Sequence, residues 1–143
     1  MKRRIGDPWM PADAYSASLK GLSVNLLVKD VEDSVAFARQ VLGATVHYSD
    51  VDFAALESCG TAWCVHADHT YDHHPLCAIA NARDGRGAGV EIRLHGIDPD
   101  TAEAKAHELG YTVLSGAVDK PHGLREVYLL DGDGYCWVPD VPL

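Results

Sequence analysis

The chain has 143 residues, of which 47% are hydrophobic, and its formal net charge is -9. A chain of this length buries one core, or two small modules that share a sheet, which excludes two large domains. The charge argues against a nucleic-acid partner, because affinity for phosphate comes from Lys and Arg, and no apolar run reaches the ~20 residues that span a bilayer. We therefore expect a soluble, cytoplasmic protein that binds neither nucleic acid nor membrane.

The first half of the chain contains an arm followed by one strand-helix unit. Residues 1–20 are expected to form an irregular arm with Trp9 as an anchor. Alternating side chains predict a strand over residues 22–28. Asp30 is the expected N-cap of the next helix, and Gly43 ends it. Three shorter strands are predicted to complete the unit: residues 45–49, 53–57 and 62–66.

The second half repeats this pattern. Residues 21–30 recur as residues 89–98, and each copy continues into a helical run that ends in Leu-Gly. Asp98 is the second N-cap and Gly110 the second helix stop. The strands expected after it are residues 112–115, 126–130 and 136–138. The repeat predicts an α+β fold in which two tandem βαβββ modules, residues 21–66 and 89–143, form a curved mixed sheet with a cleft.

The segment between the modules has its own composition. Residues 67–88 are rich in His, Asp, Gly and Arg, which is typical of a linker or of a flap over a site. We favour a solvated segment for the histidines of residues 66–74, with a metal site as the alternative. The four cysteines lack C-x-x-C spacing, so free thiols are expected at Cys59, Cys64, Cys77 and Cys136.

Three motifs carry a resemblance to a known family. They are Val28-Lys29-Asp30 with Ser34-Val35-Ala36-Phe37 and Leu42-Gly43, then Pro121-His122-Gly123-Leu124-Arg125-Glu126, then Asp131-Gly132-Asp133-Gly134. Together they resemble the vicinal oxygen chelate superfamily, which includes glyoxalase I, extradiol dioxygenases, and bleomycin and fosfomycin resistance proteins. The resemblance implies the two-module fold and a homodimer in which modules pair within or between chains.

The resemblance also assigns positions to a divalent metal. In this sequence those positions hold Ser23, Cys64, Glu91 and Val138. One carboxylate and one thiol make a weak set for a divalent ion, which prefers several oxygen or imidazole ligands. We therefore expect no catalytic metal, and whether the chain is an enzyme stays open.

Strand alternation indicates several of the candidate ligand-binding residues. Glu91, Arg93 and His95 share one face of a strand, either as ligand contacts or as a structural ion pair of Glu91 with Arg93. Asn25 is an orienting group or a satisfied amide of the cleft wall. Tryptophans 63 and 137 are expected in the core. The full set of expected ligand contacts is Ser23, Asn25, Phe53, Cys64, His66, Glu91, Arg93, His95 and His122.

Two functions remain at this point. The first is a homodimeric, metal-free protein that binds a small polar or partly aromatic molecule, with the acidic charge favouring a cationic ligand that pairs with Glu91. The alternative is a metal-dependent lyase or dioxygenase that uses Glu91 with histidines from residues 67–74 or from a second chain.

Overall fold

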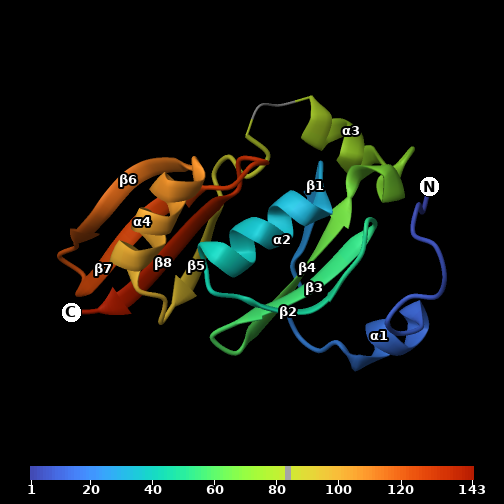
Figure 1. The fold of residues 1–143 in the computed structure, drawn as a ribbon, viewed down its shortest axis with the longest axis horizontal. Coiled ribbons are helices and arrows are strands. Elements are labelled where there is room, and N and C mark those ends of the chain that lie inside the picture. The colour runs from blue at the N-terminus through green and yellow to red at the C-terminus, as the bar shows by residue number, and fades with distance from the viewer. Residues whose placement is uncertain (83–84) are drawn as a thin grey trace.

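The computed structural model describes residues 1–82 and 85–143 and contains two four-stranded sheets (Figure 1). Residues 83 and 84 of the expected linker lie outside the described residues. The first sheet has the order β1-β4-β3-β2 and the second has the order β5-β8-β7-β6. The strands of the first are β1 (Asn25–Val28), β2 (Thr45–Ser49), β3 (Phe53–Ser58) and β4 (Thr61–Ala67). Those of the second are β5 (Glu91–His95), β6 (Thr112–Asp119), β7 (Leu124–Leu130) and β8 (Cys136–Pro142).

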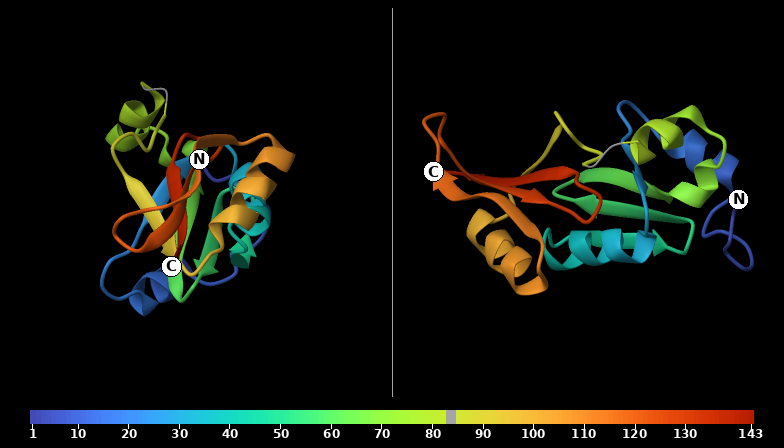
Figure 2. Two further views of the ribbon diagram at one scale, coloured as in Figure 1. Left: turned by 90° about the vertical axis from the view of Figure 1, so that its left-hand side faces the viewer. Right: turned by 90° about the horizontal axis from the view of Figure 1, so that it is seen from above.

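The two sheets have the same topology, so the two-module α+β fold is confirmed. The first strand of each is parallel to the last, and the other neighbours are antiparallel. Helices α2 (Val31–Gln40) and α4 (Pro99–Leu109) cover the same side of the two sheets (Figure 2). Asp30 Oδ1 accepts a hydrogen bond from Asp33 N at 3.2 Å, and Asp98 Oδ2 accepts one from Thr101 N at 2.9 Å. Both expected N-caps are therefore present.

One hydrophobic core runs beneath both helices. The ring centroids of Trp63 and Trp137 lie 5.2 Å apart, one from each module. Phe37 of α2 reaches Trp137 at 6.3 Å and Tyr111 at 4.8 Å. Both tryptophans are buried, as expected. Burying one such ring stabilises the fold by roughly 4 kcal/mol at about 25 cal/mol per Å², so these contacts hold the modules together.

The turn of the second module covers the outer edge of β1. Lys29 N donates a hydrogen bond to Asp133 Oδ1 at 2.9 Å, and Tyr135 Oη donates one to the carbonyl of Leu27 at 2.8 Å. Gly134 has a φ of +86°, and a Cβ there would lie 2.6 Å from Gly85 Cα. The turn therefore requires glycine at position 134, and it ties the second module to an edge that would otherwise be unpaired.

Two segments that the sequence indicated as irregular contain helices. The arm holds α1 (Ala12–Ser18), and the segment between the modules holds the 3₁₀ helix η1 (Asp68–Tyr71) and α3 (Pro75–Asn81). Helix α3 begins at a proline and is capped by His74 Nδ1, which accepts a hydrogen bond from Leu76 N at 3.1 Å. Neither α1 nor α3 buries a residue, so neither shows the apolar periodicity by which longer helices are recognised.

A few strands begin or end at other residues than the sequence predicts. Strand β1 begins at Asn25, three residues later than expected, whereas β6 and β8 each extend four residues further, to Asp119 and Pro142.

Within the described ranges, no helix is both long and apolar enough to cross a membrane.

Candidate ligand-binding site

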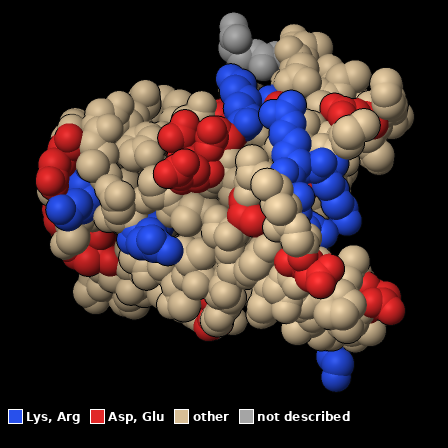
Figure 3. All heavy atoms as spheres, turned by 45° about the vertical axis from the view of Figure 1, so that its right-hand side comes forward, with Lys and Arg blue, Asp and Glu red and all other residues tan. Residues whose placement is uncertain are grey.

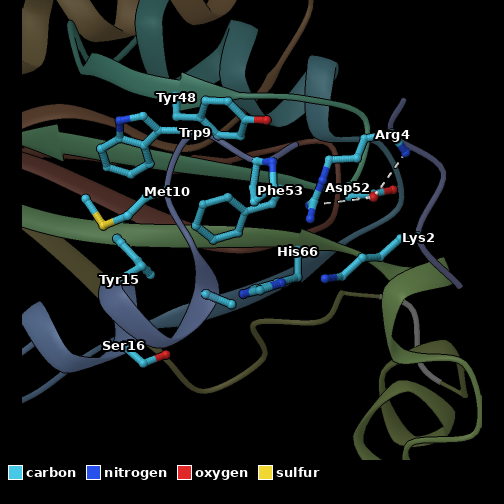
Figure 4. A pocket seen from close by; sticks show the side chains of 12 residues that line it. Lys2, Arg4, Trp9, Met10, Tyr15, Ser16, Tyr48, Asp52, Phe53 and His66 are labelled. Atoms are coloured by element: carbon cyan, nitrogen blue, oxygen red, sulfur yellow. Dashed lines mark hydrogen bonds and ion pairs between the residues drawn. The ribbon is translucent and has the colours of Figure 1, made fainter. Parts of the chain in front are cut away.

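A cavity of about 190 Å³ lies between the N-terminal arm and the face of the first sheet that is not covered by α2 (Figure 4). More than half of the residues that line it are aromatic residues, a histidine or basic residues of the arm. The lining residues are Lys2, Arg4, Pro8, Trp9, Met10, Ala12, Tyr15, Ser16, Tyr48, Asp52, Phe53 and His66.

Strand register decides which side chains of the sheet face this cavity. Phe53 of β3 pairs with His66 of β4, and the next pair, Ala54 with Val65, points into the core. Because side chains alternate along a strand, Phe53 and His66 share the open face. The ring centroids of Phe53 and His66 lie 4.9 Å apart. These two members of the expected set therefore lie together at the site.

Four aromatic rings form a closed circuit of contacts at one end of the cavity. Trp9 contacts Tyr15 at 5.7 Å and Tyr48 at 5.8 Å between ring centroids. Phe53 contacts the same two tyrosines, at 5.7 Å and 6.3 Å. Two of the rings come from the arm and two from the sheet. Edge-to-face and stacked pairs of this kind favour flat apolar groups as further partners.

The arm is fastened to the sheet by a buried carboxylate, Asp52, which is 1% exposed. It accepts hydrogen bonds from Arg3 N at 2.7 Å, from Arg4 N at 3.2 Å and from His69 Nε2 at 2.7 Å. Burial raises the pKa of Asp52, but the hydrogen bonds from His69 and the two amides outweigh it, and the pKa lies below its ordinary value. Asp52 is therefore an anion at neutral pH and holds residues 3 and 4 in place.

Lys2 and Arg4 bring positive charge to the other end of the cavity. Arg4 Nη1 lies 3.7 Å from Asp50 Oδ2 and 4.0 Å from Asp52 Oδ2. Lys2 has no ion-pair partner among the residues that the structure describes. Burial lowers the pKa of His66, which lies near this end, so its imidazole is neutral at pH 7 and offers one donor and one acceptor.

Cys64 lies on the same sheet face, beneath the arm. Its Sγ is 2.7 Å from Tyr15 Oη, and the residue is 6% exposed. Burial raises the pKa of the Cys64 thiol and also that of the Tyr15 phenol. Both groups are therefore protonated at neutral pH, and the thiol is a poor nucleophile.

Two other expected residues lie away from this cavity. Asn25 borders a separate hollow beside α3, together with Leu27 and Tyr135. Ser23 is exposed and precedes β1.

The remaining expected residues form an ionic network on the open face of the second sheet. Arg93 donates to Glu126, to Asp140 Oδ2 at 3.0 Å and to Glu91 Oε2 at 3.1 Å. Glu126 is 2% exposed and Asp140 0% exposed. Burial raises the pKa of Glu126, but hydrogen bonds from Arg93 and His122 outweigh it, and the pKa is lowered overall. Arg93 therefore pairs with both buried carboxylates.

Two histidines extend this network. His95 Nδ1 lies 2.6 Å from Asp140 Oδ1, and His122 Nε2 lies 3.2 Å from Glu126 Oε2. Sequence reasoning missed both carboxylates. Glu126 is expected as the last residue of a motif and the first of a strand, without a role in the site, and Asp140 lies two residues beyond the expected end of its strand. Their alternation with the core residues of β7 and β8 was the available signal.

The residues at the four positions that the resemblance assigns to a metal do not fit a divalent ion. Ser23 is exposed outside the strand, Val138 offers no donor, and the thiol of Cys64 is held protonated beneath Tyr15. In the described part of the chain, no three His, Cys, Asp or Glu side chains are grouped so as to hold a metal ion. The histidines after Cys64 diverge: His69 binds Asp52, and His74 caps α3.

Comparison with solved structures identifies the fold. A glyoxalase/bleomycin resistance protein/dioxygenase from Nocardioides is 23% identical, with a TM-score of 0.62 over 92% of each chain. A family enzyme of the same description from Burkholderia phytofirmans PsJN is 17% identical, with a TM-score of 0.66 over 85% of this chain and 97% of that chain. A glyoxalase-related enzyme from Fulvimarina pelagi is 17% identical, with a TM-score of 0.68 over 86% and 88%.

No protein-family model and no curated protein sequence matches the chain. The structural similarity nevertheless extends over both modules. The chain therefore has the glyoxalase/bleomycin resistance/dioxygenase fold, which is the fold of the vicinal oxygen chelate superfamily that its sequence motifs resemble. This fold carries both catalysts and binding proteins, so the activity has to be argued from the site.

Proposed function

We propose that this protein binds a small molecule stoichiometrically in the cavity beneath the N-terminal arm, without the help of a metal. The observation that carries the proposal is the circuit of Trp9, Tyr15, Phe53 and Tyr48, which lines a cavity with apolar surface. Concave, mostly apolar sites with a few polar groups are typical of ligand pockets. A dry cavity of ~150 Å³ accepts benzene, so a cavity of about 190 Å³ suits one or two fused rings.

Binding would proceed through the arm. Helix α1 buries no residue, and its Tyr15 rests on the sheet through one hydrogen bond and ring contacts. Such a weakly held element opens at low cost. A ligand would enter as α1 lifts, and it would be covered when Trp9 and Tyr15 return. The anchor at Asp52 would keep the arm attached throughout.

The donor set supports the absence of a metal from this function. The thiol of Cys64 is covered by Tyr15, and among the residues that the structure describes neither Cys64 nor His66 belongs to a group of three His, Cys, Asp or Glu side chains that could hold a metal ion. We expect ligand binding to survive treatment with a chelator. A stoichiometric divalent ion whose removal abolishes binding would instead support the lyase or dioxygenase alternative.

We also propose that the protein is a cytoplasmic homodimer. Strands β2 and β6 are sheet edges, and unpaired edges are commonly covered by a second chain. Sedimentation at micromolar concentration tests this, and a single monomeric species would count against it.

The binding proposal is tested by titration calorimetry with three naphthalenes that differ only in one substituent: naphthalene-2-carboxylate, naphthalene-2-methanol and naphthalene-2-methylammonium. At least one is expected to bind with a stoichiometry of one per chain. Phe53→Ala should weaken that binding by about tenfold or more, since it removes one wall of the cavity. Tyr128→Ala, on the second sheet, is the matched control and should leave binding unchanged. If none of the three binds at millimolar concentration, the proposal fails.

A further inference from the structure

We infer that the cavity beneath the arm selects flat aromatic molecules that carry one negative charge, as an aromatic carboxylate does. The inference rests on the proposed binding function and names its ligand class. It replaces the cationic ligand that the net charge of the whole chain favours.

The first argument is the division of the cavity into two ends (Figure 4). The rings of Trp9, Tyr15, Tyr48 and Phe53 form the apolar end. The other end holds the basic side chains of the arm. A ligand that fills both ends has an aromatic body and a polar group at one side. The cavity has room for one such body, so the polar group falls within reach of the basic end.

The second argument is the balance of charge at that end. Arg4 is engaged by Asp50 and Asp52, and Asp52 is further satisfied by His69 and two backbone amides. Arg4 and Asp52 therefore already have partners within the protein. Lys2 is the lining charge that has no partner among the described residues. A ligand anion would supply the missing partner, whereas a ligand cation would face a like charge.

The third argument is the local sign of the surface. The chain as a whole carries a net charge of -9, yet Lys and Arg side chains gather in a band on the side that holds the N-terminal end of the arm (Figure 3). Fields from exposed charges beyond about 10 Å are screened at physiological salt, so a ligand in the cavity responds to the nearby charges more than to the total. The nearby charge of the lining favours an anion.

His66 adds a hydrogen bond without adding charge. Its pKa is lowered by burial, so the ring is neutral at pH 7. A neutral imidazole donates from one nitrogen only, and that donor suits a carboxylate oxygen. The combination of one ammonium and one neutral donor matches a single carboxylate better than a doubly charged phosphate.

The test uses the same three naphthalenes in low-salt buffer at pH 7. The carboxylate is expected to bind at least about tenfold more tightly than the alcohol, and the ammonium more weakly than the alcohol. Lys2→Gln should remove most of the preference for the carboxylate over the alcohol. Lys20→Gln, in the same arm but outside the cavity lining, is the matched control and should behave as wild type. Added salt should reduce the preference in wild type.

The possible failures are distinct. If the alcohol or the ammonium binds as tightly as the carboxylate, or if Lys2→Gln keeps the full preference, the inference is overturned while the binding function stands. If none of the three binds to the wild-type protein, both fall. Lys2 is exposed and carries no packing, so a loss of fold in the Lys2→Gln variant is not expected.

Discussion

Tyr15 Oη of the N-terminal arm lies 2.7 Å from Cys64 Sγ of β4, 49 residues further along the chain. This contact places an arm residue directly over a position that the family resemblance assigns to a metal ligand. The thiol is kept protonated by burial, which raises its pKa. The arm therefore covers this position with the ring of Tyr15.

The first prediction concerns the reactivity of Cys64. Tyr15→Ala should speed the labelling of Cys64 by a thiol reagent at least about tenfold, because it removes the ring that covers the sulfur. Tyr15→Phe should not speed it, since the ring remains and the hydrogen bond that lowers the thiol pKa is lost. Peptide mass spectrometry resolves the sites, and exposed Cys59 is the internal control. Equal acceleration in both variants would contradict the covering role of Tyr15.

The second prediction concerns the anchor of the arm. Asp52→Asn should destabilise the protein by about 2 kcal/mol, because it weakens hydrogen bonds to a buried anion, and it should expose residues 5–10 to proteases. Urea unfolding and limited proteolysis measure the two effects. Asp72→Asn, which loses only the exposed pair with the terminal amine, is the control and should change neither. If the arm of Asp52→Asn stayed resistant to proteases, Asp52 would not be its anchor.

The same carboxylate sets an acid limit on the arm. In the folded protein, hydrogen bonds from His69 and two backbone amides hold the pKa of Asp52 below its ordinary value of 3.8. A lowered folded-state pKa means that this stabilisation is complete above about pH 4 and is lost as the pH falls through the folded pKa. Protease resistance of the arm should therefore hold from pH 8 down to about pH 4 and decline only below it. Release of the arm near pH 6 would point to another group.

A further prediction concerns His66. Burial lowers its pKa below 6.5, so the unfolded chain binds more protons than the folded protein between the folded pKa and 6.5. Stability should therefore fall as the pH drops from about 7 through that window. His66→Gln should flatten this slope in melting experiments, whereas substitution of the exposed His107 of α4 by Gln should not. An unchanged slope in His66→Gln would exclude His66 as the titrating group.

The last prediction separates two members of the ionic network on the second sheet. Arg93→Met should cost roughly 3–5 kcal/mol, because it leaves Glu126 and Asp140 buried without their cation. Glu91→Gln should leave the melting temperature and naphthalene binding nearly unchanged, since Glu91 is largely exposed and lies outside the cavity lining. Denaturant unfolding checks the first and calorimetry the second. A loss of binding in Glu91→Gln would indicate that the ligand binds on the second sheet instead.

Local sequence patterns determined the architecture. The repeat of residues 21–30 at 89–98 specifies two equivalent modules, and the caps at Asp30 and Asp98 specify where the helices begin. Strand alternation also placed Cys64 and His66 on one face, because successive side chains of a strand point to opposite sides whatever the rest of the fold does. These features depend on residues that are near in sequence, so the sequence by itself carries them.

Only the tertiary structure decided which face lines a cavity. Trp9 and Tyr15 reach the first sheet because Asp52 and His69 hold the start of the arm, and no local pattern records that contact. Glu91 lies on the same face of the second sheet as the buried carboxylates of β7 and β8. It therefore belongs to an ionic network and not to the cavity. Alternation reports the face on which a side chain lies, whereas its neighbours across the face depend on how distant strands and the arm pack together.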